Sequence, residues 1–133
     1  MHERIGITPA STHPGVATLF GLESGNYGPG VVQIFTDADL AGVEIHPGNW
    51  LAEIEREVGV GLTPAQLAER ASTVIDAREA RAILAEMGLD LPARVARGDQ
   101  SDLCRSLRDM TQEEIDDFVR RARDRAPPPH CGG

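Results

Sequence analysis

The stretch from Gly30 to Ile45 holds the two most strand-like runs of the chain, and it constrains the fold more than any other feature. Val31 to Phe35 is rich in β-branched residues, and Val43 to Ile45 alternates apolar with polar residues. Between the two runs, Thr36 and Asp39 have the spacing of a capped turn. We therefore expect both runs to be strands that form the floor of the fold.

Two further strands are expected before this stretch, over residues 4–8 and 15–21. The second run is almost continuously apolar, as is typical of a strand that is covered on both faces. Residues 21–30 contain four glycines and a proline, which indicates a long loop with positive φ angles.

Helical patterns follow the strands. Asn49 is a plausible N-cap with Trp50 on the apolar stripe behind it, while Thr63 and Thr111 each begin a capping box. Gly88 has the position of a residue that ends a helix. We predict helices over about 50–58, from Thr63 onward, from Ser72 or Thr73 to Gly88, over about 101–110, and from Thr111 to about 125.

Strands that precede helices indicate an α+β fold. We expect a small, mostly antiparallel sheet in the N-terminal half, covered by amphipathic helices in the C-terminal half. The polar segment 93–100 predicts a boundary between a core domain, residues 1–92, and a two-helix extension, residues 93–126, packed on that core. Residues 127–133 begin with three prolines and are expected to form a disordered tail.

The charge of the chain narrows the classes of partner. The net charge is −8, and residues 1–60 carry eight acidic residues against two arginines, which gives −6 for that part. A chain of this sign repels nucleic acid and anionic membranes, so neither is expected as a partner. A protein partner with a basic surface would instead be attracted.

All 13 basic residues are arginine, as is typical of a GC-rich bacterial genome; selection against lysine modification is the alternative. The absence of lysine excludes catalytic lysines and a phosphate-binding loop with its lysine. Two cysteines, no secretory signal and no membrane-length apolar run favour a cytosolic protein, although export without a cleavable signal stays open. Cys104 falls on an apolar helix face and is expected in the core. No metal or cofactor is expected.

The glycine-rich loop is the first candidate for a binding site. Backbone amides there could form an anion-binding nest, although a long structural turn requires the same residues. Carboxylates after the third strand and an aromatic residue at the start of a helix add possible contacts. The predicted binding residues are Gly25, Asn26, Tyr27, Gly28, Gly30, Asp37, Asp39 and Trp50.

The second candidate is a pair of titratable side chains. Glu44 and His46 fall on the same side of a strand, because strand side chains alternate with a period of two, and Val43 and Ile45 then face the core. Such a pair suits general acid–base chemistry, and a solvated strand face is the simpler interpretation. Tyr27 and His13 complete the set of candidate catalytic residues.

The run Tyr27-Gly28-Pro29-Gly30 followed by the strand that ends in Phe35-Thr36 resembles a stretch of ADP-ribosyltransferases. In that family a Gly-x-Gly turn leads into a strand with an aromatic residue and a threonine near the nicotinamide pocket. The resemblance implies a pocket under the 21–30 loop.

The sequence predicts first a small acidic protein that binds another macromolecule, as an immunity protein, an antitoxin or a regulatory protein does. The alternative is a small transferase or hydrolase, such as an ADP-ribosyltransferase-like toxin domain. A third possibility is self-association through the last two helices, which would require exposed apolar surface at Leu103, Leu107 and Phe118.

Overall fold

The structure is a computed structural model that describes residues 8–23, 30–47, 56–96 and 98–126. The elements in these residues are β1 (Thr8–Ser11), α1 (Pro14–Gly21), β2 (Val31–Ile34), β3 (Ile45–Pro47), β4 (Glu57–Val60), α3 (Pro64–Arg70), β5 (Thr73–Asp76), α4 (Ala77–Glu86), α5 (Gln100–Ser106) and α6 (Gln112–Arg125). Strands gather early in the chain and helices late, which confirms the predicted α+β fold with small antiparallel sheets.

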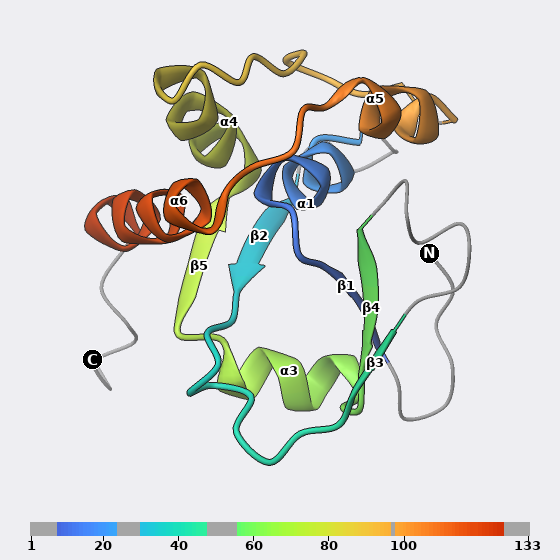
Figure 1. Cartoon of the computed structure of the whole chain (residues 1–133), viewed down its shortest axis with the longest axis vertical. Coiled ribbons are helices and arrows are strands. Elements are labelled where there is room, and N and C mark those ends of the chain that lie inside the picture. The colour runs from blue at the N-terminus through green and yellow to red at the C-terminus, as the bar shows by residue number, and fades with distance from the viewer. Residues whose placement is uncertain (1–7, 24–29, 48–55, 97, 127–133) are drawn as a thin grey trace.

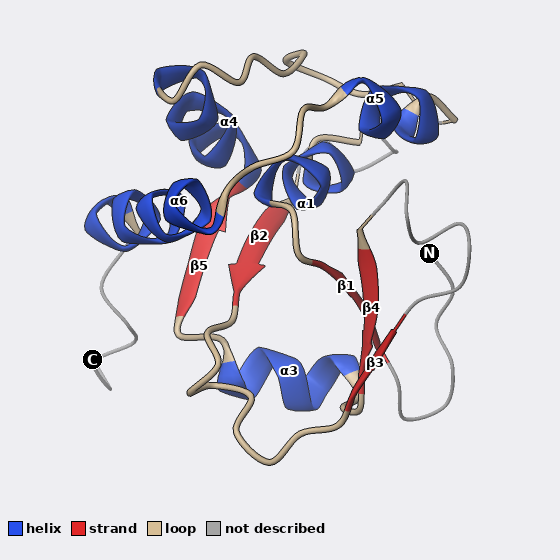
Figure 2. Ribbon diagram, in the orientation of Figure 1, coloured by secondary structure: helices blue, strands red, loops and turns tan. Residues whose placement is uncertain are grey.

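The strands form two small sheets. β4 lies at the centre of a three-stranded sheet, with β1 and β3 antiparallel on either side of it, so that Gly59 faces Pro9 and His46. β2 and β5 pair antiparallel as a separate two-stranded sheet. Figure 2 shows the two sheets between a group of helices at one end and α3 at the other.

Residues 15–21 form helix α1, so the strand predicted there is wrong. His13 caps the helix with its ring, and Pro14 occupies the first turn, where a proline needs no backbone hydrogen bond. Val16, Thr18 and Leu19 are fully buried. A short apolar run is consistent with either a buried strand or a buried helix, and here the proline and its cap decide for the helix.

Two further predictions are wrong because distant pairing overrides a local helical pattern. Residues 57–60 form β4 rather than the end of a helix, since this segment pairs with β1 and β3. Residues 73–76 form β5, and Asp76 then caps α4. The remainder of the predicted 50–58 helix, to residue 55, and the 127–133 tail lie outside the described residues, as does most of the predicted 4–8 strand.

The most local predictions are confirmed. Thr63 and Thr111 each form a complete capping box, in which the threonine side chain and the glutamine or glutamate three residues later bond each other's backbone amides. Val31–Ile34 is the predicted strand β2. After α4 the backbone turns at Gly88 with a φ of 86°, as expected of a glycine that ends a helix.

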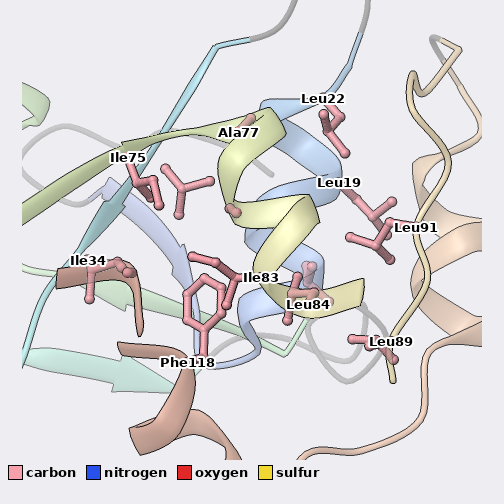
Figure 3. Packing of buried hydrophobic residues seen from close by; sticks show 14 of the residues in the cluster. Leu19, Leu22, Ile34, Ile75, Ala77, Ile83, Leu84, Leu89, Leu91 and Phe118 are labelled. Atoms are coloured by element: carbon pink, nitrogen blue, oxygen red, sulfur yellow. The ribbon is translucent and has the colours of Figure 1, made fainter. Parts of the chain in front are cut away.

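One apolar cluster holds together the helices and the two-stranded sheet. Figure 3 shows Phe118 of α6 beside Ile83 of α4, with Ile34 and Ile75 of the sheet close by. Cys104 of α5 is also fully buried in this cluster, as predicted. The predicted boundary at residues 92 and 93 stays a prediction, but side chains on both sides of it share this core. Phe118 is only 1% exposed, so it offers no apolar surface for self-association.

Helices α1 and α4 approach each other closely at one glycine. A Cβ at Gly21 would lie 2.9 Å from the Cβ of Ala77, a separation that side chains do not tolerate. A Cβ at Gly30 would meet nothing nearer than 3.8 Å. The contact between these helices therefore depends on the missing side chain at Gly21.

We predict that Gly21→Ala lowers the free energy of unfolding by about 1–2 kcal/mol, because overpacking of about 1–3 kcal/mol outweighs a gain in helix propensity of up to about 1 kcal/mol. Gly30→Ala is the matched control and should change it by less than about 0.5 kcal/mol. Urea denaturation of both variants measures the difference. Equal effects would contradict the close approach.

Candidate functional site

The structure describes six of the predicted site residues. Gly25, Asn26, Tyr27, Gly28 and Trp50 lie outside the described residues. The others are distributed over α1, the two sheets and their connections: His13, Gly30, Asp37, Asp39, Glu44 and His46.

His13 is buried, with 4% of its surface exposed. Its Nδ1 accepts a hydrogen bond from the backbone amide of Gly15 at 2.9 Å, and its Nε2 lies 2.9 Å from the carbonyl oxygen of Arg108. This pattern requires a neutral ring with its proton on Nε2. Burial above all, and the neighbouring Arg56 charge, lower the pKa of His13 below its ordinary value of 6.5, against the opposing effect of the bond to Arg108. Nδ1 thus caps α1, and Nε2 joins the start of this helix to a distant segment.

Arg56 also holds that segment, and the sequence did not single this residue out. Its guanidinium donates to the carbonyl oxygens of Cys104 at 3.0 Å and Leu107 at 3.2 Å, and to Oδ1 of Asp109 at 3.0 Å. Its backbone has a φ of 47°, a left-handed conformation that is unfavourable for a residue with a side chain. Arg56 is the only arginine or lysine between Arg4 and Arg70, and that isolation was the available signal.

Glu44 and His46 lie on the same side of the chain, with 3.5 Å between Oε2 of Glu44 and Nε2 of His46. The His46 side chain is 43% exposed and that of Glu44 83% exposed, so the pair is open to water. Ile45 is 47% exposed, so its predicted position in the core is wrong. The reason is that β3 is a three-residue edge strand, hydrogen-bonded to β4 alone.

Asp39 connects two segments that cross between the sheets. Thr36 and Asp39 bond each other's backbone amides, which confirms the predicted turn, and the Ser72 hydroxyl donates to Oδ2 of Asp39 at 2.7 Å. Burial alone would raise the pKa of Asp39, but the bonds from Ser72 and Thr36 together hold it below its ordinary value of 3.8. In Figure 1, the 35–44 connection and α3 run side by side at one end of the molecule.

Gly30 and Asp37 differ in their surroundings. The Gly30 amide donates to the Gly21 carbonyl at 2.7 Å, and the Gly30 carbonyl accepts from Ala77 at 3.0 Å, so this backbone has a structural role. Asp37 is exposed. The structure therefore does not bring the described candidate residues into one constellation: His13 is enclosed, Asp39 braces a turn, and Glu44 and His46 lie on an open edge.

The arginines of the later part of the chain are mostly neutralised by its own acidic residues. Ion pairs join Arg56 to Asp109, Arg78 to Asp76, Arg105 to Asp102, Arg108 to Glu114, Arg120 and Arg121 to Asp117, and Arg125 to Glu86. By contrast, residues 8–47 contain no arginine or lysine. Exposed acidic residues without an ion pair in the described part of the chain include Asp37, Glu69, Glu79, Asp90, Asp99 and Glu113.

In the described ranges, no three His, Cys, Asp or Glu side chains gather closely enough to hold a metal ion. None of the described helices has both the length and the apolar character needed to cross a membrane.

Comparison of the chain with models of protein families, with curated proteins and with solved structures finds no match.

We predict that Asp39→Ala lowers the free energy of unfolding at pH 7 by about 1–2 kcal/mol, because it leaves the Thr36 amide and the Ser72 hydroxyl without their acceptor. Asp37→Ala, two residues away and exposed, is the control and should have an effect below about 0.5 kcal/mol. Urea denaturation across a pH series measures both.

The pH dependence of this difference has a definite sign. Because the pKa of Asp39 is lower in the folded protein, its stabilisation is fully present above 3.8 and is lost as the pH falls through the lowered folded value. The gap between wild type and Asp39→Ala should therefore shrink in acid. A gap that stays constant down to the acid transition would rule out the ionised carboxylate as the stabilising group.

Proposed function

We propose that the protein acts in the cytosol by binding a protein partner with a basic surface, as an immunity protein or an antitoxin does. The observation that carries this proposal is the uneven pairing of charge. Most arginines of the later chain are bound to their own acidic neighbours, whereas residues 8–47 have exposed carboxylates and no arginine or lysine.

The exposed carboxylates that best support such a surface lie at the end formed by the 35–44 connection and α3. We call Asp37, Glu44 and Glu69, which are all exposed, the acidic end. The two segments are fixed to each other, because the Gly61 amide donates to the Glu44 carbonyl at 2.8 Å and Ser72 bonds Asp39. Arg70 lies on the same surface and donates to the Asp39 carbonyl at 3.4 Å.

Charge of this kind accelerates encounter with a cationic partner and selects against anionic ones. A net charge of −8 opposes the approach of nucleic-acid phosphates. Because the carboxylates are exposed, salt screens their attraction to a partner. At 0.1 M ionic strength the attraction falls off over a distance of about 10 Å. Binding through the acidic end should therefore weaken as salt is raised.

The alternative function is a small transferase or hydrolase, with Glu44 and His46 as its acid–base pair and the 21–30 loop over its pocket. The contact of 3.5 Å between these two side chains is the observation in its favour. The enzyme alternative predicts that His46→Ala abolishes turnover. NAD hydrolysis is the first reaction to assay, because of the resemblance to ADP-ribosyltransferases. Binding through the acidic end predicts no such turnover.

We predict that the triple variant Asp37→Asn, Glu44→Gln, Glu69→Gln loses a partner that wild type captures stoichiometrically from host lysate at low salt. With the captured protein purified, affinity should fall by about tenfold or more, because exposed charge pairs each contribute a fraction of a kcal/mol up to about 1 kcal/mol. Calorimetric titration measures the change.

The matched control is Asp90→Asn, Asp99→Asn, Glu113→Gln, which removes the same three charges from exposed positions elsewhere. Asp99 precedes α5 without a side-chain cap, so its substitution spares that helix. The control should bind within about threefold of wild type. Equal losses of affinity in both variants would show that net charge acts without a defined surface. If wild type captures no partner at low or at high salt, the result opposes the binding function.

A further inference from the structure

Three elements that are distant in sequence meet at the buried ring of His13. The ring caps the N-terminus of α1, and Arg56 at the start of β4 lies beside it. The third element is the segment between α5 and α6, residues 107–111, whose Arg108 carbonyl accepts from Nε2 of the ring. In Figure 1 this segment, in orange, passes α1 on its way to α6.

The ring has one place for an additional proton, and that place is already used as an acceptor. Nε2 carries the proton that it donates to Arg108, so a second proton must go to Nδ1. Nδ1 lies 2.9 Å from the amide nitrogen of Gly15. Two N–H groups would then face each other, and α1 would lose its side-chain cap.

The charged groups around the ring also oppose a proton. Arg56 of β4 and Arg108 of the 107–111 segment are both cationic and both act against a charged ring. Asp109 is the anion that would favour it, but its side chain is 94% exposed and already bonded to Arg56. A protonated ring would therefore be repelled by two arginines, and the one nearby carboxylate is exposed to water and already paired.

We propose that His13 is an acid-sensitive latch: its neutral ring joins the N-terminus of α1 to the 107–111 segment, and uptake of a proton at Nδ1 drives the ring out of its buried site, so that α1 loses its cap and the segment loses its bond to His13. Arg56 still bonds the Leu107 carbonyl and Asp109, and Leu107 and Met110 stay packed against the core cluster. The segment therefore loosens at Arg108 alone. Helix α6 keeps its place, because its capping box begins at Thr111 and Phe118 remains buried.

The direction of the switch follows from the buried environment of the ring. Because the pKa of His13 is lower in the folded protein than its ordinary value of 6.5, the latch is closed at neutral pH. Its stabilisation is complete above 6.5 and is lost as the pH falls through the lowered value. Opening is thus expected as the pH falls below 6.5.

Nuclear magnetic resonance of the full chain tests the latch directly. Nitrogen-15 labelling of the histidine rings should show the Nε2–H tautomer of His13 at pH 7 and titration below the ordinary pKa of 6.5. The hydrogen-exchange protection of the Gly15 amide, corrected for intrinsic rates, should fall about tenfold for each pH unit between 6.5 and the lowered pKa of the folded protein, because each such unit changes the free energy by 1.36 kcal/mol. Amides in α4 should keep their protection.

Two variants separate the latch from a general effect of acid. His13→Asn keeps a residue that caps helices well but cannot titrate, so the protection of the Gly15 amide should no longer depend on pH beyond the intrinsic rates. His46→Asn removes an exposed histidine and should behave as wild type. The proposal is overturned by an Nδ1–H tautomer, by titration at or above 6.5, or by equal loss of protection at Gly15 and in α4. The wild-type titration alone decides if His13→Asn does not fold.

Discussion

Burial of Leu19, Ile83 and Phe118 in one cluster is the interaction on which the rest of the structure depends. A two-stranded sheet is marginal by itself in water and requires a packed face. β2 and β5 obtain this face from helices that come before, after and far beyond them in the chain. Since α6 supplies Phe118 and Ala122 to the same cluster, the last helix is part of what keeps the sheet folded.

The three-stranded sheet is held by different means, because the shared cluster includes none of its residues. Polar contacts connect it at two places. At one, Arg56 at the start of β4 bonds the end of α5, and His13 bonds the next segment. At the other, the Gly61 amide bonds the Glu44 carbonyl, and Asp39 joins the two crossing segments. The side chains of His13, Arg56 and Asp39 thus serve largely to attach the three-stranded sheet to the rest of the protein.

The accuracy of the sequence predictions depended on how far apart the deciding contacts lie. The capping boxes at Thr63 and Thr111 and the turn at Thr36 were predictable, because all their partners lie within three residues. β4 and β5 were not, because their partners lie far away in the chain and their local patterns are helical. The same reasoning applies to the site. Glu44 and His46 lie on the same side, as predicted, although the strand is Ile45–Pro47 rather than the predicted Val43–Ile45, so Glu44 precedes it. The carbonyl partners of Arg56 lie beyond residue 100, and no local pattern predicts them.

Native-state hydrogen exchange in increasing urea tests most directly whether the sheet and the last helix depend on one cluster. The exchange free energies of the amides of Val32 in β2, Ile83 in α4 and Phe118 in α6 should converge on one value, the free energy of global unfolding. Each of these elements depends on the same buried contacts. If the α6 amides instead open at a distinctly lower free energy while β2 and α4 stay protected, the helix is a separable addition, and the account of a single shared core is wrong.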